Sequence, residues 1–244
     1  MEGKARILNE NQGTLDEVHC SKCRDKGYIA VVENGVLVTK ECSCMGKRRS
    51  MRRARKSGLM DILSAYTFKA YQTPEEWQVT AKNKAMSFVA NENGAGAWLF
   101  VSGTPGSGKT HLCTAVCGEL IKAGRDVMYM LWREDGRRLK GCANDREEYD
   151  RMMKPYRTTD VLYVDDFLKG GITEGDLNLA FDLLNARYIA RKKQTIISSE
   201  LDIAEILNID EAIGSRIYER ARDYWIRTAA ENWRLRDLRK GNET

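Results

Sequence analysis

The sequence predicts an α/β fold, in which helices cover a parallel sheet, with a small module attached at the N-terminus. Two observations carry this prediction. The run Gly103 to Thr110 reads G-x-x-x-x-G-K-T and lies between an apolar stretch, Ala97 to Val101, and a helix-like stretch, His111 to Lys122. Four of the seven cysteines form two close pairs near the start of the chain. The first pattern is typical of a phosphate-binding strand, loop and helix, and the second of a metal site.

Length and composition fit a globular protein rather than a membrane protein. The 244 residues suffice for one substantial core and a small accessory unit. No apolar run has the length of a membrane span, and Met1 to Gln12 lacks the apolar core of a signal peptide. We therefore expect a cytoplasmic protein with no membrane partner, in which seven cysteines do not form disulfides.

The first element is a cysteine-rich module. Its four paired cysteines are Cys20, Cys23, Cys42 and Cys44, spaced as C-x-x-C, eighteen residues, then C-x-C. Tyr28 to Thr39 is apolar on both sides of Asn34-Gly35, which predicts a β-hairpin that brings the two pairs together. We expect these thiolates to hold a structural Zn²⁺. A redox dithiol, merely buried cysteines, and a site in which His19 replaces one thiolate are the alternatives.

A basic segment follows the cysteines. Its cations are Lys47, Arg48, Arg49, Arg52, Arg53, Arg55 and Lys56. Such a cluster suits a polyanion, and a solvated helix face or a linker is the alternative. We expect a linker helix and a connecting segment over Met51 to Thr73, then a helix over Glu75 to Val89.

The glycine-rich run is predicted to bind the phosphates of ATP. Glycines let backbone N–H groups turn onto phosphate oxygens, Lys109 neutralises the β- and γ-phosphates, and the Thr110 hydroxyl can reach Mg²⁺. A glycine-rich turn that matches by chance is the alternative. Apolar residues recur at helical spacing after the loop, so Cys113 and Cys117 are expected to fill the core. The residues expected to contact nucleotide here are Gly103, Thr104, Pro105, Gly106, Ser107, Gly108, Lys109, Thr110 and His111.

Three further core strands are predicted after this helix. They are Val127 to Leu131, Val161 to Val164 and Thr195 to Ser199. Because Asp165 and Asp166 directly follow the second of these strands, we expect Asp165 to hold Mg²⁺ and Asp166 to orient the attacking water. Ser199 or Glu200, at the end of the last strand, could contact the γ-phosphate or that water; a strand running into a polar loop is the alternative.

Two arginines, Arg216 and Arg220, lie four residues apart late in the chain, on one helical face. An arginine from a neighbouring subunit can stabilise the charge of a phosphoryl-transfer transition state. A solvated surface pair is the alternative.

Together these motifs resemble those of the DnaC/DnaI-type replicative helicase loaders, and most closely their phage-type members. The matching segments are the Cys20-x-x-Cys23 and Cys42-x-Cys44 pairs, GTPGSGKTHL, VLYVDDF, IISSEL, IGSRIYER and NWRLR. The resemblance implies an AAA+ ATPase with a five-stranded parallel sheet and with ATP held between subunits of a homo-oligomer.

The resemblance also implies roles for single residues. Gly103 to Thr110 corresponds to the Walker A loop, and Asp165 with Asp166 to the Walker B acids. Ser199 or Glu200 falls at the sensor-1 position, and Arg234 at sensor 2. Arg216 and Arg220 match the arginine-finger region, which acts on the ATP of the adjacent protomer.

Several features depart from the usual AAA+ pattern. Asp166 stands where many members carry Glu, and Glu200 where the family has Asn, so we expect slow turnover. After Arg220 only Ala221 to Thr244 remains, which is too short for the helical lid of most members. An insertion, Trp132 to Tyr156, corresponds to one that lines a single-stranded DNA path in the loaders; a solvated amphipathic helix is the alternative. Its cations are Arg133, Arg137, Arg138 and Lys140.

The resulting expectation is an ATP-dependent loader of a replicative hexameric DNA helicase onto single-stranded DNA. It has a zinc-binding module over 1–50, a basic linker helix over 51–73 and a lidless AAA+ domain over 74–244. One alternative is an IstB-type transposition helper ATPase, a class expected to resemble this chain mainly after residue 60. The other is a zinc-dependent adaptor with a vestigial nucleotide site.

Overall fold

The core of the protein is a five-stranded parallel sheet, as the sequence predicts. The computed structural model describes residues 1–244 apart from 17, 57–59, 92–95, 229–231 and 236–244. The strands follow the order β4-β5-β6-β3-β7 across the sheet, and every pairing is parallel. Their bounds are β3 (Trp98–Ser102), β4 (Val127–Leu131), β5 (Val161–Asp165), β6 (Gln194–Ser199) and β7 (Trp225–Arg227).

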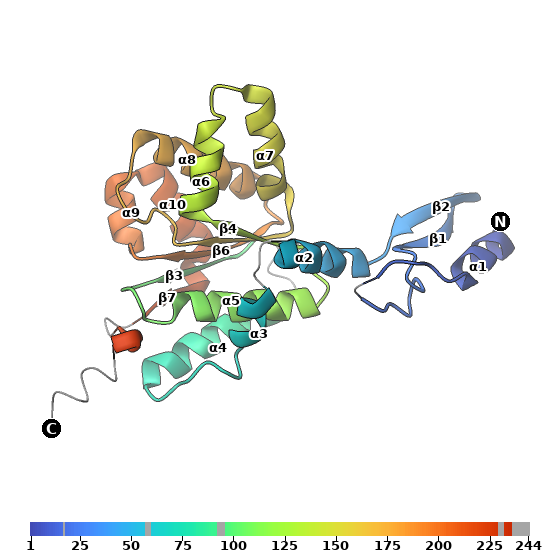
Figure 1. Cartoon of the computed structure of the whole chain (residues 1–244), viewed down its shortest axis with the longest axis horizontal. Helices are drawn as coiled ribbons and strands as arrows, with labels where there is room; N and C mark the ends of the chain where they lie inside the picture. The colour runs from blue at the N-terminus through green and yellow to red at the C-terminus, as the bar shows by residue number, and fades with distance from the viewer. Residues whose placement is uncertain (17, 57–59, 92–95, 229–231, 236–244) are drawn as a thin grey trace.

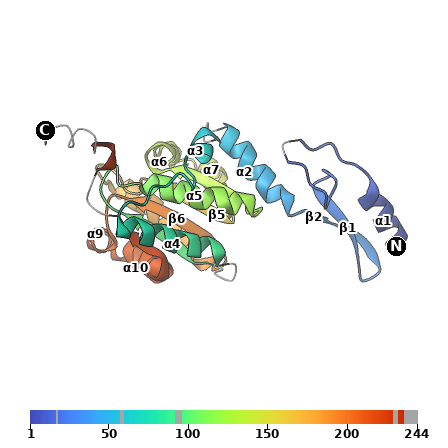
Figure 2. The same cartoon turned by 90° about the horizontal axis from the view of Figure 1, so that it is seen from below.

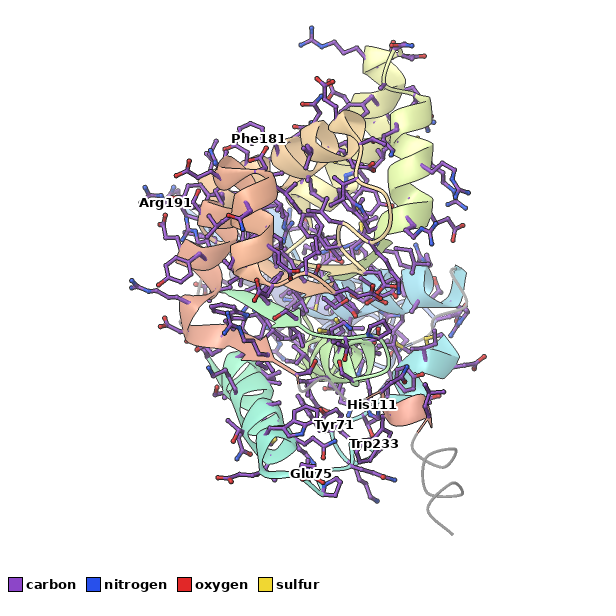
Figure 3. The ribbon with its side chains drawn as sticks, turned by 90° about the vertical axis from the view of Figure 1, so that its left-hand side faces the viewer. Tyr71, Glu75, His111, Phe181, Arg191 and Trp233 are labelled. Carbon is purple, nitrogen blue, oxygen red and sulfur yellow. The ribbon has the colours of Figure 1, made fainter. Side chains whose placement is uncertain are left out.

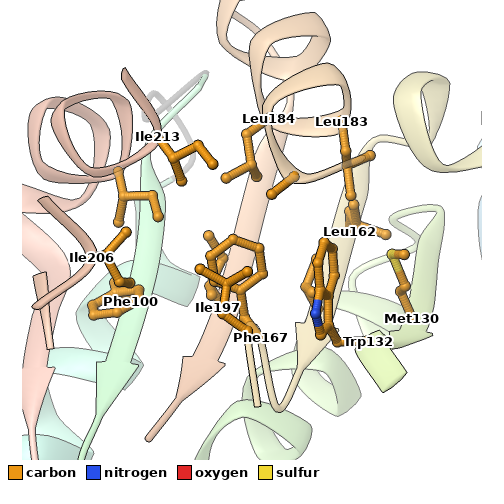
Figure 4. Packing of buried hydrophobic residues seen from close by; sticks show 14 of the residues in the cluster. Phe100, Met130, Trp132, Leu162, Phe167, Leu183, Leu184, Ile197, Ile206 and Ile213 are labelled. Carbon is orange, nitrogen blue, oxygen red and sulfur yellow. The ribbon is translucent and has the colours of Figure 1, made fainter. Parts of the chain in front are cut away.

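Helices cover both faces of this sheet, so the core has three layers (Figure 1). One face carries α8 (Glu174–Ile189), α9 (Ile203–Ile209) and α10 (Glu211–Ala221), together with α6 (Trp132–Gly141) and α7 (Arg146–Thr158). Phe100, Leu162 and Ile197 pack there beneath the helices (Figure 4). The sheet is buried on both faces because βαβ crossovers place helices on each side.

The opposite face is covered by α4 (Glu76–Ala90) and α5 (Lys109–Lys122). Cys113 and Cys117 on α5 are buried in this layer, so the prediction that they fill the core is confirmed. The chain then ends its described part with η1 (Arg222–Tyr224), β7 and η2 (Trp233–Leu235). Within the described ranges, no helix combines the length and the apolar character needed to cross a bilayer.

The cysteine-rich module lies to one side of the core (Figures 1 and 2). It contains α1 (Glu2–Glu10) and the antiparallel hairpin of β1 (Tyr28–Glu33) and β2 (Val36–Glu41). Asn34 and Gly35 both have positive φ, 51° and 77°, as a two-residue hairpin turn requires. The predicted hairpin is therefore confirmed.

Helix α2 (Cys44–Lys56) joins the module to the core, and α3 (Met60–Ala65) follows it. The Ser50 hydroxyl accepts the Val127 N–H at 2.7 Å and donates to the Arg125 carbonyl at 3.2 Å. A Cβ at Gly46 would lie 2.4 Å from the Gly124 carbonyl oxygen, so the helix packs closely on the turn before β4. The helix begins at a cysteine of the module and is docked onto the sheet.

This docking also corrects part of the interpretation of the basic segment. Arg48 is only 2% exposed and pairs with Asp25 at 2.8 Å. Arg49 and Arg53 pair with Asp126 at 2.9 and 2.7 Å. These three arginines bind carboxylates of their own chain because α2 lies between Asp25 and Asp126. The sequence does not indicate these pairs, since both acids are distant from the helix along the chain. They are not free to form a polyanion-binding face.

Candidate nucleotide site and cysteine cluster

The glycine-rich loop lies at the carboxyl end of β3 and leads into α5, as expected for a phosphate-binding loop. Gly103, Gly106 and Gly108 have φ values of 144°, 78° and 90°, which only glycine adopts readily. Space requires glycine too, since a Cβ at Gly103 would lie 2.0 Å from Thr228 Oγ1 and one at Gly106 1.9 Å from Asn232 Oδ1. The loop therefore has the backbone that lets successive N–H groups face a phosphate.

Lys109 is buried at the start of α5 and binds its own loop. Its Nζ donates to the carbonyl oxygens of Gly103 and Thr104 at 2.7 and 2.8 Å. Burial lowers the pKa of Lys109, and the nearby carboxylates of Glu200 and Asp166 partly oppose this change. A phosphate in the loop would replace the neutral carbonyl acceptors with negatively charged oxygens.

Asp165 is the most heavily hydrogen-bonded acid near the loop. Its carboxylate accepts the hydroxyls of Thr110, Tyr129 and Tyr163 at 3.2, 2.5 and 2.6 Å, and also that of Ser198. Burial, followed by the Asp165 charge, raises the pKa of Tyr129, so that phenol remains a donor. Sequence reasoning missed these tyrosines, although Tyr163 lies two residues before Asp165 and so on the same face of the strand.

The Thr110 hydroxyl and the Asp165 carboxylate bring together the two oxygen ligands expected for Mg²⁺. Their separation of 3.2 Å places both at the same edge of the sheet. Hydroxyl, carboxylate and phosphate oxygens are the ligands that Mg²⁺ takes in nucleotide sites. The donor set therefore fits this ion.

Asp166 and Glu200 lie on either side of Lys169. Lys169 Nζ is 3.1 Å from Asp166 Oδ2 and 2.8 Å from Glu200 Oε1. Ser199 is different, because its buried hydroxyl donates to the Phe167 carbonyl at 2.8 Å. Of the two candidates at the end of β6, Glu200 lines the nucleotide cavity and Ser199 supports the neighbouring turn.

A cavity of about 340 Å³ lies against the glycine-rich loop. Its lining includes residues 105–111, Asp166, Lys169 and Glu200. On one side it has an aromatic wall of Tyr66, Tyr71, His111 and Trp233; Figure 3 shows the last three close together. Aromatic rings of this kind can stack on a nucleotide base. Sequence reasoning missed Tyr66, Tyr71 and Trp233 because they come from segments outside the motif.

His111 belongs to this wall rather than to the phosphate cradle. Its ring stacks on Tyr66 with centroids 4.7 Å apart and planes 15° apart, and Nε2 donates to the Thr67 carbonyl at 3.0 Å. Burial lowers the pKa of His111, although the hydrogen bond to Thr67 acts in the opposite direction. His111 thus holds the segment after α3 against the loop.

The structure does not bring Arg216 and Arg220 to this cavity. Both lie on α10 and contact α8, where the Arg216 guanidinium is 4.9 Å from the Phe181 ring centroid and that of Arg220 is 4.7 Å from the Tyr188 centroid. In Figure 3 Phe181 lies at the end of the molecule opposite His111. Their action on a neighbouring protomer stays a prediction. Arg234 is in η2, and its side chain is outside the described part of the structure.

The predicted DNA-facing insertion forms α6 and α7. Arg138 pairs with Glu134 at 2.7 Å, and Lys140 pairs with Asp176 at 2.5 Å. Arg133 and Arg137 are exposed and line a small groove with Gly170 and Gly171. Only part of the predicted basic face is therefore available to a polyanion.

The four cysteines of the module converge as predicted. All four Sγ atoms lie within 4.8 Å of one another, with Cys20 and Cys42 3.8 Å apart and Cys23 and Cys44 3.6 Å apart. A tetrahedral Zn²⁺ with Zn–S bonds of about 2.3 Å holds its sulfurs about 3.8 Å apart. The four thiols therefore fit Zn²⁺. His19 is outside this cluster and instead binds Asp25 through Nδ1 at 2.9 Å.

Surrounding groups position the cluster and act differently on its thiols. The Cys20 N–H and Arg48 both bind Asp25 Oδ1, at 2.7 and 2.8 Å, which ties one cysteine turn to α2. Burial favours the neutral thiol of Cys23, but the Gly27 N–H, donating at 3.3 Å, and the neighbouring thiols lower the pKa of Cys23 to about 7. Burial raises the pKa of Cys42, and it raises the pKa of Cys44 to about 12. Metal ligation by cysteine needs the thiolate, so the environment prepares Cys23 for a metal, whereas Cys42 and Cys44 would lose their protons on binding it.

Comparison with known proteins supports the nucleotide site. The model of the family described as IstB-like ATP binding protein matches residues 16–240. The chain belongs to the IstB-like ATP-binding family. It is therefore an ATP-binding AAA+ ATPase, as the glycine-rich loop indicated. This match begins before the first cysteine, so the expectation that such proteins resemble this chain mainly after residue 60 is wrong.

Relatives of this IstB-like chain include phage and replication proteins. Phage-like element PBSX protein XkdC of Bacillus subtilis is 31% identical over 238 residues, covering 92% of this chain and 88% of XkdC. The replicative helicase loader DnaC of Escherichia coli is 25% identical over 169 residues, covering 68% and 67% of the two chains. The resemblance to helicase loaders is thereby confirmed.

Solved structures show the same fold. A crystal structure of the DnaC helicase loader aligns with a TM-score of 0.59 and 22% identity, covering 68% of this chain and 98% of that one. A crystal structure of DnaI gives 0.56 and 22%, covering 70% and 92%. The IstB-like core described above is thus a DnaC/DnaI-like AAA+ fold.

Proposed function

We propose that this protein is an ATP-dependent loader of a replicative DNA helicase onto single-stranded DNA. The observation that carries the proposal is the combination of two sites in one chain, joined by a helix that packs on the sheet. A nucleotide site with Lys109, Thr110 and Asp165 in place is connected through α2 to a four-cysteine cluster. In this proposal the cysteine module contacts the helicase, while the AAA+ core binds ATP and forms oligomers.

Nucleotide state would act as the switch in this cycle. ATP between two protomers contacts Lys109 of one and Arg216 or Arg220 of the other, which favours assembly. Hydrolysis removes the γ-phosphate contacts and releases partner or DNA. Mg²⁺, held by Thr110 and Asp165, would neutralise developing charge on the phosphates, and Asp166 would orient the attacking water.

The metal in the module would serve structure rather than chemistry. Four cysteine ligands leave no open position for a substrate, so Zn²⁺ would hold the hairpin and the two cysteine turns together. The proposed surface for the helicase therefore depends on the metal.

Single-stranded DNA would follow the groove beside α6. Arg133 and Arg137 are exposed there, and the glycines at 170 and 171 leave the backbone open beside them. Guanidinium groups along such a groove can track phosphates. A solved structure of the replication initiator DnaA is described as bound to single-stranded DNA, and it shares this fold with a TM-score of 0.57.

The test is capture of a hexameric replicative helicase from the same host, with ATP and without nucleotide. We expect a complex that depends on the cysteine module, so that Cys23→Ser loses it and Cys142→Ser keeps it. Absence of a complex under both conditions would refute the loader role and leave the ATPase standing. Binding to a transposase instead would favour the transposition helper, and helicase binding unaffected by Lys109→Ala would favour an adaptor with a vestigial site.

A further inference from the structure

The nucleotide cavity contains a cation that no phosphate-loop motif supplies. Lys169 lies in the turn after β5 and lines the same cavity as Lys109, Asp166 and Glu200. Its ammonium bridges two carboxylates, with Nζ 3.1 Å from Asp166 and 2.8 Å from Glu200.

The turn that carries Lys169 is held by packing and by a backbone hydrogen bond. Asp166 and Leu168 have φ of 55° and 56°, in the left-handed region that a branched side chain such as leucine rarely adopts. Phe167 and Leu168 are buried in the core, and the Lys169 N–H donates to the Asp166 carbonyl at 3.1 Å. Backbone strain that the surrounding packing holds in place clusters at functional sites. Packing therefore directs the lysine side chain into the cavity.

The positive charge of Lys169 offsets the two carboxylates of the cavity. A triphosphate would enter a cavity lined by the carboxylates of Asp166 and Glu200, which repel its negative charge. An ammonium has three donors and no acceptor. One N–H donates to Asp166 Oδ2, and Glu200 Oε1 is 2.8 Å from Nζ as an ion pair without a hydrogen bond, so the ammonium keeps a donor for a further oxygen. Glu200 itself cannot donate a hydrogen bond to phosphate when it is ionised, whereas the lysine that it holds can.

We propose that Lys169 binds the terminal phosphate of ATP and, held in place by Asp166 and Glu200, makes the site prefer ATP over ADP. This inference rests on the proposed switch, in which the two nucleotides must be told apart. Lys109 is expected at the β- and γ-phosphates, and because ADP also has the β-phosphate, Lys109 supports binding of both nucleotides. Lys169 lines the same cavity from outside the loop, beside Asp166 and Glu200, and would contact the γ-phosphate, which only ATP possesses.

The test compares fluorescent ADP with a fluorescent non-hydrolysable ATP analogue in the presence of Mg²⁺. We expect Lys169→Met to weaken the ATP analogue about tenfold, which is about 1.4 kcal/mol, and ADP less than twofold, because only the ATP analogue loses a charged donor to its terminal phosphate. Retained ADP binding also reports that the variant is folded. Lys169→Arg, which keeps the charge, should recover most of the preference for the ATP analogue.

Lys193→Met is the matched control. Lys193 is also a partly buried lysine paired with a carboxylate, 3.2 Å from Asp160, but it does not line the cavity. Its loss should leave both affinities unchanged. If Lys169→Met lost affinity for both nucleotides equally, or for neither, the role of Lys169 would be overturned while the ATP site itself would stand. A wild-type protein that binds neither nucleotide would overturn the ATP site together with it.

Discussion

The nucleotide site and the cysteine cluster are both announced by short motifs, but they depend on very different support. The glycine-rich loop extends from β3, whose apolar residues Trp98 to Val101 are all completely buried. Before Cys44, the described part of the chain buries only Ala5, Ala30, Cys23 and Cys42 among its apolar residues. A domain with a large core can shape its loop before ligand arrives, whereas a unit with so small a core needs a metal to fold.

The strongest way to separate the two regions is to remove the metal. Because structural Zn²⁺ contributes about 10–16 kcal/mol in small domains, chelation should unfold the hairpin. Two-dimensional NMR should show collapse of amide dispersion for β1 and β2, with the core signals and nucleotide affinity retained. Protein purified under reducing conditions should contain one zinc per chain, and Cys23→Ser should contain none. Hairpin signals that survive chelation would contradict this dependence.

A cavity in the core should have the opposite pattern. Phe100→Ala removes a completely buried ring beneath α9 and α10, with an expected cost of about 3–5 kcal/mol. Urea unfolding of the core should shift to lower concentration while zinc content stays the same. Loss of zinc together with core stability would mean that the two regions fold as one unit.

Changing the phosphate contacts should affect ligand affinity and spare both folds. Lys109→Ala should weaken ATP by about 2 kcal/mol, roughly thirtyfold, because it removes a charged donor to phosphate. Titration with a fluorescent nucleotide measures this change, and thermal unfolding of the apo protein checks the fold. Unchanged ATP affinity would remove the assignment of the loop.

A smaller effect is expected where the regions meet. Asp126→Ala removes the carboxylate that holds Arg49 and Arg53 at 2.9 and 2.7 Å. Both arginine side chains are about a third exposed, so the free energy of docking between α2 and the core should fall by about 1 kcal/mol. NMR relaxation should then report faster independent motion of the module. Identical tumbling of wild type and variant would show that Ser50 and the Gly46 contact suffice for docking.

The smallest effect concerns acidity at the aromatic wall. Burial lowers the pKa of His111 below its ordinary 6.5, so the folded state favours the neutral ring. The contribution of His111 to stability is present above pH 6.5 and declines as the pH falls and the ring must be charged. An NMR titration of His111 should give a midpoint below 6.5, moving toward 6.5 in Tyr66→Ala. A midpoint above 6.5 would contradict the burial of this ring.

Local patterns made much of this structure predictable. Runs such as Trp98 to Val101, the glycines of the loop, and Asn34-Gly35 each determine a strand, a loop or a turn through contacts within a few residues. The strand β7 was not located from sequence, because Trp225–Arg227 is only three residues long and becomes a strand by pairing with β3.

The parts of the sites that escaped prediction depend on contacts between distant segments. Tyr129 reaches Asp165 from the neighbouring strand, and Lys169, which follows β5, pairs with Glu200, which follows β6. Arg48 has the sequence environment of a solvated cation and yet is buried against Asp25. No spacing rule reports such partners, because the fold sets which segments meet.

Helix α2 carries both a sulfur of the cluster, from Cys44, and the Ser50 hydroxyl that binds the sheet. Cys44 and Ser50 are six residues apart, which is about 9 Å along a helix. Ser50 holds the N–H of Val127, and two residues further along the same strand Tyr129 holds Asp165. We therefore expect a displacement of the cysteine module to reach the start of β4, and through that strand the residue that binds Asp165.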